Sequence, residues 1–243
     1  MKENLLLAVL PRKERERLDP HLEHVTLDQG AVLIEAEEPI KYVLFPYDLV
    51  TSTIQAMSDG SQIEVGLMGI EGMIGIQFWL RQKTTSTRTI VQVAGSGLRM
   101  KASVFKKEVM DTLSPLNDLV ASYTHAFLVM TSQVAVCNRL HEMDERLSRW
   151  LMLIYNRMQR DEFQLTQEFL AMMLGAHRPT VSTAASILQK AGYIRYSRGN
   201  IKILDPKGLE QGTCECLRIM EAQFDKIFDQ SWIELARKQN QEG

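Results

Sequence analysis

The stretch LTQEFLAMMLGAHRPTVSTAASILQKAGYI constrains the chain most, because it reads as two helices joined by a short turn. Thr166 suits the N-cap of the first helix, and Gly175 can end that helix as a C-cap. The second helix begins near Arg178, since Pro179 is tolerated in a first turn, where its missing N–H has no intrahelical partner. This pattern predicts a helix-turn-helix, a motif whose second helix enters the major groove of DNA with its N-terminal end first.

Candidate DNA contacts lie on the polar side of the second helix. Val181, Ala185 and Leu188 fall on its packing face. The candidates are short polar side chains and one long cation: His177, Arg178, Thr180, Ser182, Thr183 and Ser186. Arginine can bond bidentately to guanine, and Ser and Thr can touch bases or phosphates. An ordinary helical hairpin inside a core is the alternative interpretation.

The charge pattern favours DNA over a core hairpin. The formal net charge of the chain is -2, yet residues 176–204 contain no Asp or Glu. Within them GYIRYSRGNIKIL predicts a β-hairpin with its turn at residues 198–200. Three basic residues line the exposed side or tip of that hairpin, namely Arg195, Arg198 and Lys202. A wing after a recognition helix adds contacts with phosphates, so the sequence predicts a winged helix.

The first part of the chain is rich in short segments of β type. They occupy residues 31–36, 42–46, 49–56, 62–68 and 88–95, with Gly, Pro or Asp turns between them. Asp59-Gly60 between two of them is a strong hairpin signal. Several short strands at this spacing predict an antiparallel sandwich or barrel of the jelly-roll kind. Helical patterns bracket the strands, at residues 3–10 and 103–113.

Four glycines stand three residues apart in GLMGIEGMIG, which invites comparison with a phosphate-binding loop. They are Gly66, Gly69, Gly72 and Gly75. The stretch has neither a Walker lysine nor a Gly-x-Gly-x-x-Gly pattern. We therefore expect turns that join tightly packed strands, and no nucleoside triphosphate site.

After Pro115 the apolar residues repeat at alternating steps of four and three, as in the seam of a coiled coil. The seam consists of Leu116, Val120, Tyr123, Phe127, Met130, Val134, Cys137 and His141. Burial against the β-domain of the same chain is one expectation. A sustained seam favours the same helix of a second subunit, which would give an isologous dimer. An amphipathic helix follows at residues 144–159, and the tail from Leu209 has helical spacing.

The three cysteines, Cys137, Cys214 and Cys216, form no disulfide framework and include no second pair at metal-ligand spacing. We expect them to be reduced and structural, and we expect no metal. No apolar run is long enough to span a bilayer, and the start of the chain lacks a small-residue cleavage site. A cytoplasmic protein without a membrane partner is expected. No nucleophile, base and orienting acid stand at motif spacing, so we expect no enzyme.

The order of β-barrel, seam helix and winged helix resembles the Crp/Fnr superfamily of bacterial transcription regulators. Residues 165–194 resemble its DNA-binding signature, DERLSRWL the approach to it, and SRGNIKILD the wing. The resemblance implies an α+β fold. Its parts would be a cyclic-nucleotide-binding-like β-barrel sensor domain at 1–114, a dimerisation helix at 115–142, and a winged helix-turn-helix with a C-terminal helical extension at 143–243.

By this resemblance the chain is a homodimer that binds double-stranded DNA and reads the two halves of a palindromic operator, with RNA polymerase as a further partner. The alternative is a small-molecule-binding signalling module whose winged helix mediates protein contacts. Pro179 replaces the Glu of the commoner Arg-Glu-Thr-Val form, and Thr183 stands where many members have a basic residue. The operators of relatives are therefore not transferable.

The residues of this chain at the effector-binding positions depart further from the family pattern. Members that bind a cyclic nucleotide hold it with a Gly-Glu pair and a downstream Arg, but here Ile76 follows Gly75. Arg88 is the one candidate for the phosphate position, at an altered spacing. Three cysteines at or beyond the seam helix cannot supply the four ligands of an iron-sulfur cluster. We therefore predict no cofactor and expect neither a cyclic nucleotide nor a cluster.

Overall fold

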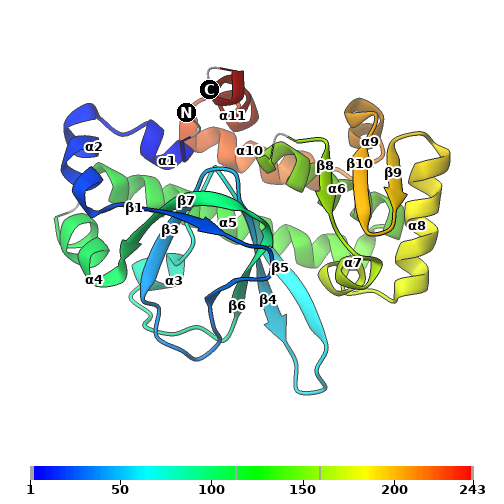
Figure 1. Cartoon of the computed structure of the whole chain (residues 1–243), viewed down its shortest axis with the longest axis horizontal. Helices are drawn as coiled ribbons and strands as arrows, with labels where there is room; N and C mark the ends of the chain where they lie inside the picture. The colour runs from blue at the N-terminus through cyan, green and yellow to red at the C-terminus, as the bar shows by residue number, and fades with distance from the viewer. Residues whose placement is uncertain (1–2, 113, 159, 242–243) are drawn as a thin grey trace.

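Two antiparallel sheets form the N-terminal domain of the computed structural model, which describes residues 3–112, 114–158 and 160–241 (Figure 1). One sheet has the order β1-β7-β3 and the other β2-β6-β4-β5. The strands are β1 (Glu23–Leu27), β2 (Val32–Ile34), β3 (Tyr42–Pro46), β4 (Val50–Ala56), β5 (Gln62–Met68), β6 (Arg88–Val93) and β7 (Gly95–Lys101). All five predicted strands are present, which confirms the α+β fold with a jelly-roll-like domain.

Short helices surround this domain. They are α1 (Leu5–Ala8), α2 (Arg12–Leu18), a 3-10 turn (Asp19–His21), α3 (Ile76–Trp79), α4 (Ala102–Phe105) and a π-helical turn (Lys106–Met110). The helical patterns at residues 3–10 and 103–112 therefore form shorter helices than predicted, and residue 113 of the second pattern lies outside the described residues. Asn4 fixes α1, because its buried amide nitrogen donates to the carbonyls of Pro46, Ile70 and Gly72 while its oxygen accepts from Leu6 N.

The long helix α5 (Pro115–Leu140) lies against the glycine-rich end of β5. The ring of Phe127 occupies the space where Gly66 lacks a side chain, and the ring of Tyr123 does the same at Gly72. A Cβ at either glycine would overlap the ring. The glycines therefore allow the helix to approach the strands closely, in agreement with the expected tight packing.

Three helices follow β10 in the chain. They are α9 (Pro206–Gln211), α10 (Cys216–Phe228) and α11 (Trp232–Gln241), and α6 (Met143–Met158) precedes the winged domain. Helix α10 packs along α5, and α11 contacts α1, α6 and α10. Figure 1 shows the result: the C-terminal helix lies close to the N-terminal one, far from the wing.

The predicted dimer seam is consequently wrong. All of its residues are covered within this chain: Leu116, Val120, Tyr123, Phe127, Met130 and Cys137 are buried, and Val134 and His141 are partly buried. By length and composition α5 could also cross a membrane, which the sequence did not lead us to expect. The core helix of a soluble protein passes the same test, and the apolar side of α5 packs on β5 and α10.

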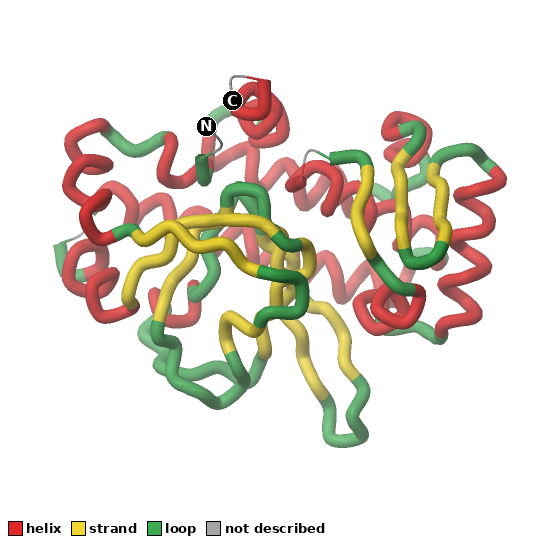
Figure 2. The backbone as a smooth tube through the Cα atoms, in the orientation of Figure 1, coloured by secondary structure: helices red, strands yellow, loops and turns green. Residues whose placement is uncertain are grey.

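The winged domain contains α7 (Gln167–Leu174), α8 (Arg178–Lys190) and a small sheet. The sheet has the order β8-β10-β9, with β8 at Glu162–Gln164, β9 at Ile194–Ser197 and β10 at Asn200–Ile203. Figure 2 shows this sheet beside α8, at the end of the molecule opposite α2 and α4. The helix-turn-helix and the hairpin are confirmed, and β8 is an additional strand that the sequence did not predict.

Candidate nucleic-acid interface

The turn between α7 and α8 is built by its capping residues. Thr166 accepts a hydrogen bond from the backbone N–H of Phe169 at 3.2 Å, which starts α7. Gly175 ends it with a φ of +57°, a left-handed conformation that suits glycine. Pro179 stands in the first turn of α8 after the N-cap residue His177. The short turn fixes the angle at which the N-terminal end of α8 leaves the domain.

Helix α8 separates a buried face from a polar one. Val181, Ala184, Ala185 and Leu188 are buried. The candidate DNA contacts His177, Arg178, Thr180, Thr183 and Ser186 are exposed, whereas Ser182 is half-buried. The polar face lies at the N-terminal end of the helix, where backbone N–H groups and the helix dipole favour anions.

Gln167 organises the start of α8 from the neighbouring helix. Its Oε1 accepts from Ser182 Oγ at 2.9 Å and, more weakly, from Arg178 Nε at 3.4 Å. Sequence reasoning missed this residue. Its position in the first turn of α7 is the signal, because that turn crosses the start of the recognition helix in a helix-turn-helix.

Two hydroxyls on α8 are turned back toward the backbone. Thr183 Oγ1 donates to Pro179 O at 3.0 Å, and Ser186 Oγ donates to Ser182 O at 2.9 Å. Each oxygen still has lone pairs to accept from a base or a backbone group. The long, exposed side chain of Arg178 is the group on this face that reaches farthest.

The wing is a hairpin with a two-residue turn. Arg198 and Gly199 have φ values of +51° and +77°, and a type I′ turn requires positive φ at both central residues. Arg195 pairs directly with Lys202 across the strands, so two cations stand side by side on an exposed face. Like charges in that position repel each other. A polyanion such as the DNA backbone would relieve the repulsion.

Tyr196 and Gln189 hold the wing against α8, and sequence reasoning missed both. Gln189 Oε1 accepts from Tyr196 N at 2.8 Å, and Tyr196 OH donates to Leu165 O at 2.9 Å. Burial raises the pKa of Tyr196, which keeps its hydroxyl protonated as a donor. A hollow opens between helix and wing, lined by Gln167, Arg178, Ser182, Ser186, Gln189 and Arg198.

The cations of this surface are free of acidic partners. Within the described residues, Arg178, Arg195, Arg198 and Lys202 form no ion pair. One acid lies nearby: Glu162 of β8 stands opposite Lys202 in the sheet and accepts a hydrogen bond from Asn200 at 2.6 Å.

Residues 145–211 match the family model of the Crp-like helix-turn-helix domain. Similar solved structures include FixK2 of Bradyrhizobium japonicum, with 14% identity, 79% of this chain and 98% of that chain covered, and a TM-score of 0.64. A CRP-family transcriptional regulator of Thermus thermophilus is 15% identical, with 77% of this chain and 95% of that chain covered and a TM-score of 0.62. The c-di-GMP-responsive global regulator CLP of Xanthomonas campestris is 14% identical, with 79% of this chain and 99% of that chain covered and a TM-score of 0.61. Curated proteins gave no match.

Residues 145–211 are therefore a Crp-like helix-turn-helix domain, and the chain has the fold of CRP-family regulators. The domain match identifies the helix-turn-helix part of the chain, and the likeness to solved structures shows the fold.

Two positions correspond, by the resemblance, to the effector-binding residues of the family. Gly75, with a φ of +95°, begins α3, and the following Ile76 is buried where a ribose-binding carboxylate is expected from the resemblance. Arg88 pairs with Glu35 at 3.1 Å on the surface of the domain. A phosphate at Arg88 would have to compete with that carboxylate.

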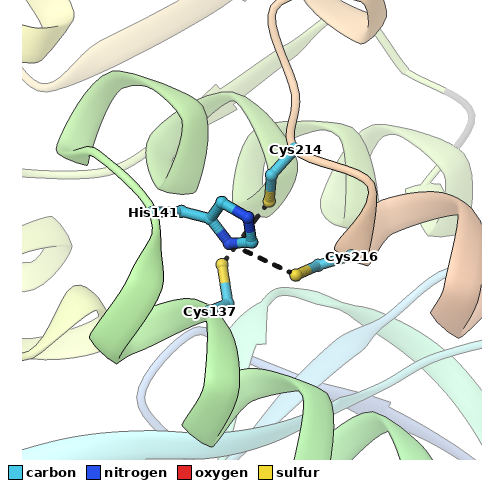
Figure 3. A group of neighbouring side chains, drawn as sticks. All are labelled: Cys137, His141, Cys214 and Cys216. Atoms are coloured by element: carbon cyan, nitrogen blue, oxygen red, sulfur yellow. Dashed lines mark hydrogen bonds between the residues drawn. The ribbon is translucent and has the colours of Figure 1, made fainter.

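The three cysteines lie together in the structure. Cys137, Cys214 and Cys216 meet His141 at the C-terminal end of α5 (Figure 3). The hydrogen bond from Cys214 lowers the pKa of Cys137 to about 5, and the charge of Arg149 adds to this against the effect of burial. The cysteines are free and buried, and no spacing in the sequence indicates that they lie together, because the return of α10 along α5 joins residues that are far apart in the sequence.

Proposed function

We propose that the chain is a transcription regulator that works as a homodimer and reads a palindromic operator through the N-terminal end of α8. The observation that carries this is the polar, acid-free face of α8 next to a wing with unpaired cations. Arg178 would contact a base edge, and Gln167 would position it. Arg195, Arg198 and Lys202 would contact phosphates, which add affinity without sequence information.

The dimer surface that we propose is the exposed face of α5, opposite the buried seam. Large apolar side chains stand free there: Leu128 is 56% exposed, Val136 43% and Leu140 70%. The same face carries the exposed small or polar residues Ser122, His125, Ser132 and Ala135. Their spacing of three and four residues fits the same helix of a second copy, as in an isologous two-fold contact.

Contacts between the β-domain and the DNA-binding part give the dimer a means of control. Ile63 of β5 lies directly against Gly175 in the turn of the helix-turn-helix. Trp150 of α6 donates to the buried Glu64 of β5 at 2.9 Å. A ligand that displaces β5 could therefore move both recognition helices, provided that it binds the two arrangements with different affinity.

The remaining parts of the proposal follow from this role. A regulator of this kind acts in the cytoplasm, contacts RNA polymerase once it is bound to DNA, and has no enzymatic activity of its own. Winged helices also bind proteins, so the alternative of a small-molecule-binding signalling module is separated by experiment.

The test is selection of bound duplexes from a random DNA library by the purified, ligand-free chain, followed by sequencing. We expect an enriched palindrome whose half-sites are centred about ten base pairs apart. Affinity should fall by roughly 0.9 log units per log unit of salt for each phosphate neutralised. Retention without enrichment and without salt dependence would refute DNA reading and favour the protein-contact alternative.

A further inference from the structure

Four metal-ligating side chains converge where α5 ends and α10 begins (Figure 3). Cys137 and His141 come from the last turn and the C-cap of α5. Cys214 precedes α10, and Cys216 is its first residue. The three cysteines are buried, and 14% of the His141 side chain is exposed. The cluster is therefore nearly closed to solvent and is made by two segments that are distant in sequence.

The geometry of the cluster fits one tetrahedral ion. All four ligand atoms lie within 4.8 Å of one another. The Sγ atoms of Cys137 and Cys214 are 3.5 Å apart, and Cys216 Sγ is 3.4 Å from His141 Nδ1. Zinc bonds of about 2.3 Å to sulfur and about 2.0 Å to nitrogen imply tetrahedral edges of roughly 3.8 and 3.5 Å. Small shifts of the side chains therefore place all four atoms on one ion.

Neighbouring groups support the ligands as they do in zinc sites. His141 turns Nδ1 toward the sulfurs, and its Nε2 lies 3.1 Å from Glu215 Oε2. A carboxylate behind a histidine fixes the orientation of the ring and raises its basicity as a ligand. Gln133 Nε2 donates to Cys216 Sγ at 3.2 Å, which favours the thiolate.

The local charge also fits a zinc ion held by three thiolates, whose total charge is negative. Arg146 and Arg149 of α6 are buried, and among the described residues neither pairs with a carboxylate. Both arginines interact electrostatically with Cys137: the charge of Arg149 lowers the pKa of Cys137, and Cys137 acts to raise the pKa of Arg146. Two buried cations without a carboxylate are unfavourable alone, and an anionic metal centre beside them offsets that cost.

We propose that Cys137, His141, Cys214 and Cys216 bind one Zn²⁺ ion, which fastens the C-terminal helices to the end of α5. Three thiolates and one imidazole are a ligand set that zinc prefers. The four ligands leave no open position, so the ion is structural. An iron-sulfur cluster distributes its ligands over several irons and requires wider spacing than this cluster has. The site lies at the junction of α5 and α6 and is independent of the proposed operator.

The test uses the full-length chain, purified with a reductant and stripped of metal by a chelator. Titration with Co²⁺ should saturate at one equivalent and give the sulfur-to-cobalt charge-transfer absorption and strong visible bands of tetrahedral thiolate coordination. Zn²⁺ should then displace the cobalt. Protein isolated without the chelator should contain one zinc per chain. Binding of several weak equivalents without charge transfer would show adventitious metal and overturn the proposal.

Variants identify the ligands. Cys214→Ser with Cys216→Ser should abolish the charge-transfer band, and His141→Ala should weaken Co²⁺ binding by at least about tenfold. His21→Ala, at an exposed histidine of the N-terminal 3-10 turn, is the matched control and should bind as the unaltered chain does. Unchanged binding by the His141 and cysteine variants would refute the site. If a variant fails to fold, the titration of the unaltered chain decides. A Cys137–Cys214 disulfide in metal-free protein prepared without oxygen would likewise refute it.

Discussion

Arg157 of α6 and Glu71, in the loop after β5, form an ion pair in which both side chains are wholly buried, with Nη2 2.7 Å from Oε1. Arg157 Nε donates to the same oxygen at 2.8 Å, and Nη1 donates to Leu153 O at 3.0 Å. The guanidinium also stands 5.7 Å from the ring centre of Phe224 and 5.3 Å from that of Trp232. One side chain thus connects the β-domain, α6 and the C-terminal helices.

Removal of one partner of this pair should destabilise the chain strongly. Glu71→Gln leaves the Arg157 charge buried without its counter-ion, which costs about 3–5 kcal/mol. The double variant Glu71→Gln with Arg157→Met should lose clearly less than the sum of the two single losses. Urea denaturation measures the free energies of unfolding. Glu16→Gln in the exposed pair with Arg12 is the control, and it should cost less than about 1 kcal/mol. Additive losses would show that the pair is not coupled.

Glu64 should make stability fall as the pH rises. Burial raises its pKa to about 7, while the hydrogen bonds from Ser52 and Trp150 oppose that shift. Ser52 Oγ lies within hydrogen-bond distance of both Glu64 Oε2 and Gln92 Oε1, but its hydroxyl can donate only one proton. A protonated Glu64 that donates to Ser52 satisfies all three groups. The folded state therefore holds a proton that the unfolded chain releases above its ordinary pKa of 4.5.

The sign and the window follow from that difference in proton binding. Between about pH 4.5 and 7 the folded state binds more protons, so the free energy of unfolding declines as pH rises, by up to about 3 kcal/mol. Glu64→Gln keeps the amide neutral and should remove this part of the decline. Denaturation of both proteins at pH 5 and pH 8 checks it. An equal decline in the variant would assign the pH dependence to other groups, such as Glu221, whose pKa burial also raises to about 7.

The winged helix could be predicted because its signals are local. Thr166, Gly175 and Pro179 mark helix ends through their own backbone and capping chemistry, so α7 and α8 begin and end where the sequence indicates. Strands β1 and β7 escaped prediction for the converse reason. Strand β7, GSGLRMK, has glycine at its first and third positions, a residue that is disfavoured in strands, and its pairing with β3 rests on tertiary contact.

Partners of the buried faces could not be predicted, because periodicity records that a face is covered and not what covers it. Tyr123 packs against Gly72 and Phe224 of the same chain, contacts that no spacing along α5 encodes. The meeting of Cys137 with Cys214 depends on the same return of α10 along α5. Both failures come from contacts between segments that are distant in the sequence.

Arg178 and Arg198 should affect DNA binding in different ways. Arg178→Ala should cost about 1–3 kcal/mol on the selected operator and relax base preference there. Arg198→Ala, at the tip of the wing, should weaken binding to all sequences similarly and reduce the salt dependence by about one phosphate. Binding isotherms on operator and random duplexes at several salt concentrations separate the two. Arg218→Ala on the exposed side of α10 is the control. Equal losses on both duplexes for both variants would contradict the assigned roles.

The exposed face of α5 should carry the dimer contact. Leu128→Asp places a charge in the centre of that face, where a second copy would have to bury it without a partner, so we expect dissociation to monomers at micromolar concentration. Sedimentation equilibrium measures the change. Met57→Asp, at a side chain 59% exposed on the β4–β5 hairpin, makes the same chemical change away from α5 and should leave the dimer intact. Because Leu128 is exposed in the single chain, the variant should fold, which circular dichroism can check.

A dimer that survives Leu128→Asp and Leu140→Asp together would exclude α5 as the interface. Loss of operator binding in step with loss of the dimer would show that two recognition helices are needed at once, as a palindromic site requires.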